Sequence, residues 1–244
     1  MARLGLFLGA ITMVLCATAN VRAQPAEPLR VLMTVGGVDY NTGIVRRLRQ
    51  HENLELIVHD FDNDPAVFTA ETLSGIDAVL MYHRDNTADT NERAALQDFL
   101  NAGGGVVVLH HAIANYPDWE DWWRRNLGGL YVLASDADRP PSRYFPNFDG
   151  VAVKTEPHPI TRRFNTAWRY QDESYDDLWI SNKVRPLLRT TAFGSEAQLA
   201  WIGPSKDGRV IYIQPGHGER IMREAIYLNL LEDALIWTSG QEVE

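Results

Sequence analysis

Short apolar runs alternate with amphipathic segments along the first half of the chain. The runs that have the length of strands cover residues 29–35, 54–59, 76–82 and 106–109. The segments between them, where helices are expected, cover residues 41–51, 69–73 and 90–101. Apolar strands separated by helices are typical of a mainly parallel sheet with helices on both faces. The pattern therefore predicts an α/β fold.

The second half of the chain is less regular. Residues 130–150 are rich in Pro, Asp and Arg, which predicts a long surface loop suited to act as a lid or binding loop. The remaining regular elements are expected to be a strand at 151–154, antiparallel strands at 186–191 and 197–202, a strand at 210–214 and a final helix at 220–237. Since no repeat or linker interrupts the pattern, residues 29–240 are predicted to form a single domain.

Local signals refine this picture. Thr90 is expected to cap the helix over 90–101, and Arg93 at the third position after it argues against a capping box. Gly36 and Gly37 close the first strand. No Gly-x-Gly-x-x-Gly spacing follows them, so a dinucleotide site is not supported.

Histidines occur where predicted strands end. The fourth strand is followed directly by His110 and His111, and the strand before the last helix is followed by His217. In an open α/β sheet, ligands bind outside the carboxyl ends of the strands. Right-handed crossovers place Asp39 and His83 on the same edge. We therefore expect these strand ends to meet at one site.

Residues 1–23 have the features of a signal peptide. A basic start at Arg3 precedes an uncharged apolar run over residues 4–19, and small residues precede a cleavage site after Ala23. The run is short for a membrane span, which needs about 20 residues, and an uncleaved anchor is the alternative. We expect a linker at residues 24–28 and an exported protein, either periplasmic or secreted.

The only cysteine, Cys16, lies within the predicted signal peptide. The mature chain would then contain no cysteine, which excludes a cysteine nucleophile, a cysteine-ligated metal and disulfide bonds. The formal net charge of -9 falls by two further charges when Arg3 and Arg22 are removed with the leader. Because no basic stripe offsets this acidity, we expect neither nucleic acid nor an anionic membrane as a partner.

A set of short motifs occurs in the order found in a known family. The motifs are Leu109-His110-His111-Ala112 with Tyr116-x-Asp118-Trp119, Gly128-Gly129-x-Tyr131, His158-Pro159-Ile160-Thr161, Asp172-Glu173-x-Tyr175 and Gly216-His217. From about residue 29 to about residue 240, the chain resembles the ThuA-like family, which is associated with trehalose utilisation and sugar metabolism. The resemblance implies a flavodoxin-like sheet related to the fold of class I glutamine amidotransferases.

The chain also departs from the pattern of these relatives. The amidotransferases carry a cysteine near the position of His110, and its absence here excludes their chemistry, although His217-Gly218-Glu219 keeps their His-x-Glu spacing. ThuA-like proteins usually have a histidine shortly after the Gly-Gly-x-aromatic motif, where this chain has Ser135-Asp136-Ala137-Asp138. If that histidine is a metal ligand in the family, either Asp136 or Asp138 replaces it or metal binding is weak.

Residues at the strand ends are suited to proton transfer. An imidazole transfers protons near neutral pH, and a nearby carboxylate orients the ring or acts as its partner acid. We predict His110, Glu173 and His217 as the catalytic residues. The same residues are an alternative ligand set for a divalent metal such as zinc, with an open position for water or a sugar hydroxyl. No cofactor is certain, because no His-x-x-x-His or His-Glu-x-x-His spacing occurs.

Further residues are candidates for contacts with a sugar substrate. They are Asp39, His83, His111, Trp119, Asp172, Tyr175 and Glu219. Structural roles are the alternatives. Trp119 with Trp122 and Trp123 forms either a sugar platform or part of the core, and Glu219 could instead stabilise the start of the last helix. His158, which precedes a proline, is expected to fix a turn.

Two classes of function remain open. The first is an exported hydrolase or lyase that acts on a glycoside or an oxidised sugar. A glycosidase needs two carboxylates; Asp172 and Glu173 would point to opposite sides of a strand, whereas Glu173 could pair with Asp39 or Glu219. The second class is a non-catalytic sugar-binding accessory domain, with or without a divalent metal. Both take a small sugar or glycoside, and the sequence leaves the oligomeric state open.

Overall fold

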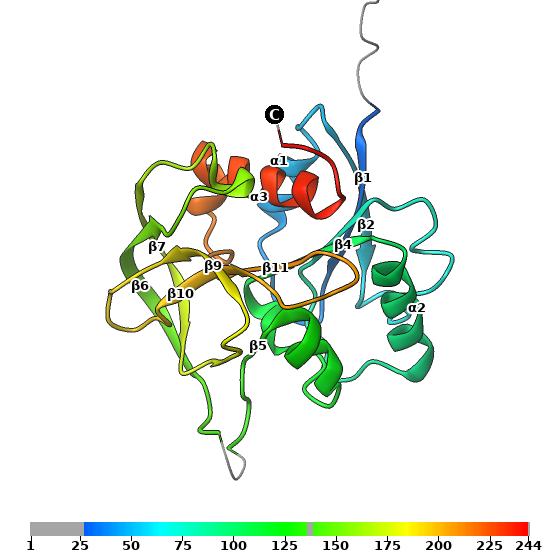
Figure 1. The fold of residues 1–244 in the computed structure, drawn as a ribbon, viewed down its shortest axis with the longest axis horizontal. Helices are drawn as coiled ribbons and strands as arrows, with labels where there is room; N and C mark the ends of the chain where they lie inside the picture. Colours follow the sequence, from blue (N-terminus) through cyan, green and yellow to red (C-terminus); the bar gives the residue numbers. More distant parts are fainter. Residues whose placement is uncertain (1–26, 136–138, 244) are drawn as a thin grey trace, which may run out of the picture.

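The computed structural model describes residues 27–135 and 139–243. The predicted signal peptide and the loop residues Asp136 and Asp138 lie outside the described residues. The described chain folds into a nine-stranded mixed sheet that is covered by helices on both faces (Figure 1). This confirms the predicted α/β class with antiparallel strands in the second half. Within the described ranges, no helix is long and apolar enough to cross a membrane.

The sheet has a parallel half and an antiparallel half, in the order β2-β1-β3-β4-β11-β10-β9-β6-β7. The parallel strands are β2 (Leu54–Asp60), β1 (Leu29–Val35), β3 (Ala78–Met81), β4 (Gly105–Leu109) and β11 (Val210–Ile213). The antiparallel strands are β10 (Gln198–Ile202), β9 (Arg185–Arg189), β6 (Arg143–Lys154) and β7 (Ala167–Asp176). A separate pair joins β5 (Gly129–Leu130) to β8 (Trp179–Ile180). Because β4 and β11 are parallel neighbours, their carboxyl ends lie side by side.

Cores on both faces of the sheet explain the apolar runs. The helices are α1 (Thr42–Leu48), α2 (Thr90–Asn101) and α3 (Ala225–Thr238). In β4, Val107 and Leu109 join the core that includes α1 and α3, while Val106 and Val108 join the core that includes α2. Successive side chains of a strand point to opposite faces, so a strand covered on both sides must be apolar throughout.

The structure corrects the expected loop over residues 130–150. Strand β6 begins at Arg143 and pairs along β7, so the second part of this segment is regular structure. The signal was weak because only alternate positions such as Phe148, Gly150 and Ala152 are buried, and polar residues separate them. The strand was therefore hidden in a stretch with the composition of a loop.

Helix boundaries also differ from the sequence pattern. Asp89 caps α2 in place of Thr90, and its side chain accepts hydrogen bonds from the backbone N–H groups of Asn91 and Glu92. Glu92 completes a capping box, so the expectation that no box exists was wrong. The predicted helix at 69–73 is a turn, and the last helix begins at Ala225 after a 3-10 turn over Ile221–Arg223.

Candidate functional site

His110 is fixed in one tautomer where β4 ends. The chain leaves β4 at Leu109 and enters a 3-10 turn in which His110 is fully buried and has a φ of 52°. Its Nδ1 atom lies 2.8 Å from the carbonyl oxygen of Gln214. A carbonyl oxygen can only accept, so Nδ1 carries the proton. The lone pair of the neutral ring is therefore on Nε2.

Asp172, on β7, holds the loop that follows β11. Its carboxylate accepts hydrogen bonds from the backbone N–H groups of Gly216, His217 and Gly218, at 2.7, 3.2 and 2.6 Å. The loop also packs closely on His110, since a Cβ atom at Gly216 would lie only 2.7 Å from the Cβ of His110. Asp172 therefore places His217 beside His110, and its oxygens are used within the protein.

Glu173 lies between the two histidines. Its Oε2 atom is 3.3 Å from Nε2 of His110 and 3.3 Å from Nδ1 of His217, while the hydroxyl of Tyr144 donates to its Oε1. The side chain of His110 is 0% exposed, that of Glu173 17% and that of His217 39%. The three predicted catalytic residues thus meet in one cluster that leads from the interior to the surface.

Two tyrosines complete the cluster. The hydroxyl of Tyr175 lies 3.0 Å from Nε2 of His110, and the two rings are stacked with centroids 4.9 Å apart. Burial raises the pKa of Tyr175 well above its usual value, so the hydroxyl stays protonated and donates to the imidazole. Tyr144 pairs with Tyr175 across β6 and β7. Tyr144 was not predicted as a site residue, because its segment was expected to be part of a surface loop.

The surroundings keep Glu173 ionised and His111 neutral. Burial raises the pKa of Glu173, but its contact with His110, the hydrogen bond from Tyr144 and the charge of His217 outweigh burial, so this pKa lies below its usual value. Burial lowers the pKa of His111 to about 3. Burial and the hydrogen bond to Glu173 raise the pKa of Tyr144 to about 12. Near neutral pH Glu173 is therefore ionised, and the ring of His111 is neutral.

The cluster borders a cavity of about 390 Å³. Its walls come from β6, from β7 and from the loop after β11, and they include Asn147, Gln171, Glu173, His217 and Arg220. The cavity is large enough for a small sugar. It gives a ligand access to the carboxylate of Glu173 and the ring of His217.

Other predicted histidines have structural partners. His83 is fully buried, with Nδ1 2.8 Å from the Thr34 hydroxyl and Nε2 2.9 Å from the Tyr116 hydroxyl. His111 donates from Nε2 to the carbonyl oxygen of Tyr82 at 2.8 Å and stacks on the Tyr82 ring. These contacts account for His83 within the core and leave His111 as a neighbour of the cluster.

Trp119, Asp39 and Glu219 lie outside the cluster. Trp119 is buried and stacks on Trp122, which favours the core alternative and argues against a sugar platform. Asp39 is exposed, and Glu219 is exposed and paired with Arg223. Neither carboxylate belongs to the group that Glu173 forms with the histidines, which leaves Glu173 without a second catalytic carboxylate from these candidates.

The cluster has the dimensions of a metal site. One ligand atom from each of His110, Glu173 and His217 lies within 4.8 Å of the others. Ligands about 2.0–2.1 Å from a tetrahedral zinc ion are themselves about 3.3 Å apart. The two distances from Glu173 Oε2 match that spacing at 3.3 Å each. Imidazole and carboxylate donors are also the types that zinc and similar ions take, so the residues fit a divalent cation.

The sheet and the strand-end site define a flavodoxin-like α/β protein with a glutamine amidotransferase-like fold. A ThuA-like protein from Parabacteroides merdae shares the fold, with a TM-score of 0.70 and 18% identity over 89% of this chain and 92% of that chain. A ThuA-like protein from Bacteroides uniformis gives a TM-score of 0.66 and 18% identity over 93% and 96% of the two chains. PurLQS from Thermotoga maritima gives 0.57 and 11% identity over 86% and 99%.

A comparison with known protein families identifies the family within this fold class. Residues 20–238 match the ThuA family, which is described as trehalose utilisation. The chain therefore belongs to the ThuA family, and the resemblance seen in the sequence motifs is confirmed. No curated protein sequence matches the chain. At 18% identity or less, the likeness to the solved structures shows the fold alone.

Proposed function

We propose that this protein is an exported carbohydrate-processing enzyme, a hydrolase or lyase that acts on a glycoside or an oxidised sugar. The family description, trehalose utilisation, supports a role in carbohydrate metabolism. The observation that carries the catalytic part is the position of Glu173 Oε2, 3.3 Å from each of two imidazole nitrogens beside a sugar-sized cavity. The basic start and uncharged apolar run within residues 1–23 support export.

In this proposal Glu173 is the base. Its lowered pKa keeps it ionised near neutral pH, so it accepts a proton from water or from a sugar carbon next to a carbonyl. His110 lies against the same oxygen of Glu173, and its Nε2 atom accepts a hydrogen bond from Tyr175. His217, at the cavity, exchanges protons with the leaving group or with solvent.

A divalent cation is compatible with the same residues. His110, Glu173 and His217 would hold it, and when bound it would polarise a carbonyl, a hydroxyl or a water molecule. Tyr175 would then lose Nε2 of His110 as its acceptor, because one lone pair cannot serve both. Proton transfer by Glu173 and metal binding by Glu173 are thus competing uses of one carboxylate oxygen.

Substitution of Glu173 by Gln tests the catalytic proposal. The change keeps the shape of the side chain but removes its charge, so kcat/KM is expected to fall about 100-fold or more. Turnover of trehalose, of a trehalose derivative in which one hydroxyl is oxidised to a ketone, and of aryl glycosides is measured for the wild type, Glu173→Gln and Glu219→Gln. Glu219 is an exposed glutamate outside the cluster, so its variant should keep the wild-type rate. Equal rates for all three proteins would contradict the role of Glu173.

The second candidate, a non-catalytic sugar-binding domain, is favoured by one observation. The ring of Tyr144 is 49% exposed beside Glu173, and an exposed aromatic ring with a polar tip suits contact with a sugar. This alternative predicts saturable sugar binding by the wild type without product from any of the tested sugars. Calorimetry on the same sugars therefore separates the two candidates.

A further inference from the structure

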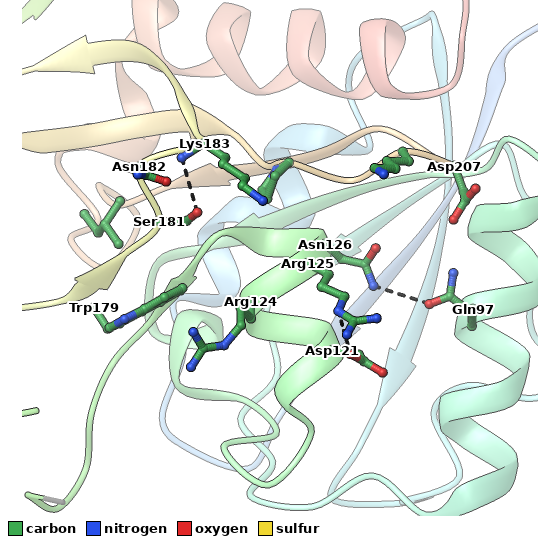
Figure 2. A pocket seen from close by; sticks show the side chains of 13 residues that line it. Gln97, Asp121, Arg124, Arg125, Asn126, Trp179, Ser181, Asn182, Lys183 and Asp207 are labelled. Carbon is green, nitrogen blue, oxygen red and sulfur yellow. Dashed lines mark hydrogen bonds and ion pairs between the residues drawn. The ribbon is translucent and has the colours of Figure 1, made fainter. Parts of the chain in front are cut away.

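We propose a second ligand site, for an anionic sugar, at the end of β11 opposite to His217. A cavity of about 910 Å³ lies between α2, the helical turn over Trp122–Leu127, the segment from β8 and the turn before β11 (Figure 2). Lys206 and Asp207 precede β11, whereas His217 follows it. Among the residues that the structure describes, this cavity shares no lining residue with the cavity beside Glu173.

Basic side chains outnumber acidic ones in the lining of this cavity. The charged lining residues are the basic Arg124, Arg125, Lys183 and Lys206 and the acidic Asp121 and Asp207. Arg124 pairs with Glu120 at 2.7 Å and Arg125 with Asp121 at 3.0 Å, but all four side chains are well exposed, so these pairs contribute little. Lys183 and Lys206 form no ion pair with any other described residue. A local excess of positive charge in a chain of net charge -9 favours an anionic ligand.

The guanidinium of Arg124 is held in place by aromatic rings. It lies 4.9 Å from the ring centroid of Trp123 and 5.1 Å from that of Trp179, and the two rings pack edge to face. Figure 2 shows Arg124 beside Trp179 at the cavity. A guanidinium that is already ordered loses less entropy when it binds an anion. The half-buried ring of Trp179 also gives the wall an apolar surface suited to a sugar.

Amide side chains supply the remaining chemistry of a sugar site. Gln97, Asn126 and Asn182 line the cavity, and the hydrogen bond between Asn126 and Gln97 is long, at 3.4 Å (Figure 2). A weak bond of this length is readily exchanged for bonds to sugar hydroxyls. Asn126 belongs to a turn of π-helix, a form that is frequent at functional sites. Cations, amides and an aromatic wall together match a sugar that carries a carboxylate or a phosphate.

Calorimetry with the full chain tests this site. The probes are trigalacturonate, which carries carboxylates, glucose 6-phosphate, which carries a phosphate, neutral maltotriose and inorganic phosphate. We expect at least one anionic sugar to bind about tenfold or more tightly than maltotriose, and added salt to weaken that binding. The anionic sugar that binds identifies carboxylate or phosphate as the recognised group.

Variants locate the binding. The double variant Lys183→Gln/Lys206→Gln removes two exposed charges from the cavity and is expected to lower affinity about tenfold. Arg162→Gln removes an exposed charge outside the cavity and should leave affinity unchanged. Glu173→Gln should also leave it unchanged, so the result does not depend on the proposed activity. The inference is overturned if no anionic sugar binds, if maltotriose or inorganic phosphate binds as tightly, or if the double variant binds like the wild type.

Discussion

One carboxylate oxygen of Glu173 lies beside two imidazoles, and the other accepts a hydrogen bond from the hydroxyl of Tyr144. A carboxylate with partners on both oxygens is restricted in rotation and is stabilised in its charged form. Tyr144 is therefore a positioning residue for Glu173. Because its ring is half exposed, its hydroxyl can be removed without opening a buried cavity.

Substitution of Tyr144 by Phe isolates this hydrogen bond. The bond lowers the pKa of Glu173, so its loss raises that pKa and moves the acidic limb of the rate profile to higher pH. We expect kcat to fall about tenfold at the pH optimum. Tyr131→Phe is the control. It removes the hydroxyl of a ring that packs against Tyr175, and its rate profile should match that of the wild type. An unchanged acidic limb in Tyr144→Phe would rule out the positioning role.

Asp172 performs a structural task next to the catalytic candidates. It satisfies three backbone N–H groups of the loop that carries His217, and an amide at this position would direct N–H groups at some of those donors. Asp172→Asn is therefore expected to lower the free energy of unfolding by about 2 kcal/mol. Urea denaturation measures the change. Asp149→Asn weakens an exposed ion pair with Arg169 and a hydrogen bond from Gln171, and it should cost clearly less than Asp172→Asn; an equal cost for both would contradict this account.

The residues of the site were predictable to different degrees. His110 and His217 follow apolar strands, and the rule that ligands bind at the carboxyl ends of strands brings them together. Glu173 was identified only through the motif order, because it lies within a strand and at no strand end. Tyr144 could not be found, since its role depends on the pairing of β6 with β7, which is a long-range contact.

At the scale of elements, an ion network joins α3 to the turn after β6. Arg163 bonds to Glu232 at 2.6 Å and to Asp233 at 2.6 Å, and both carboxylates are nearly buried. Hydrogen bonds from His51, and then from Arg163 and Asn53, outweigh burial and lower the pKa of Glu232 to about 2. Glu232 therefore links α3 both to this turn and to the segment before β2.

This network predicts how stability depends on pH. A carboxyl group whose pKa is lower in the folded state stabilises the fold above its usual pKa of 4.5, and that contribution is lost as the pH falls from 4.5 towards 2. Glu232→Gln should lower the free energy of unfolding by about 2 kcal/mol at pH 7, with a difference that shrinks on acidification. Urea denaturation of the wild type and the variant at pH 7 and again below pH 4.5 measures this difference in the free energy of unfolding. Glu55→Gln, from an exposed pair with Arg30, is the control; a difference that is constant with pH would contradict the assignment.

Helices and strands were predicted correctly where the sequence of the element itself determines it, and less well where the element depends on distant partners. The strands up to β4 and the helices α1 and α2 were predicted because a doubly covered strand is apolar throughout and a helix has its own period. The segment at 69–73, which was predicted as a helix, forms a turn. The end of β6 was predicted as a strand at 151–154, but its first part was missed because one of its faces is exposed and it contains Pro146, so its signal depends on its partners. The bounds of α2 were predicted correctly, but its cap was assigned to Thr90 in place of Asp89, because both residues are competent caps.

At the scale of the whole molecule, the cluster connects the two halves of the sheet. His110 follows β4 and His217 follows β11 in the parallel half, whereas Glu173 lies on β7 at the far antiparallel edge. These residues are distant in sequence, so they form a metal site only when the chain is folded. An ion that binds there would stabilise the folded state relative to the unfolded chain.

Thermal unfolding with added metal tests this coupling. At a free zinc concentration about 100 times the Kd, the folded state gains about 2.7 kcal/mol. For a chain of this size such a gain raises Tm by roughly 5–11 °C. His217→Ala removes one ligand and should abolish most of the rise, and a chelator should reverse it in the wild type. His59→Ala, which removes a histidine outside the cluster, should keep the full rise. If zinc, manganese and magnesium all leave Tm unchanged, or if His217→Ala responds like the wild type, the cluster binds no metal and Glu173 is free to act as the base.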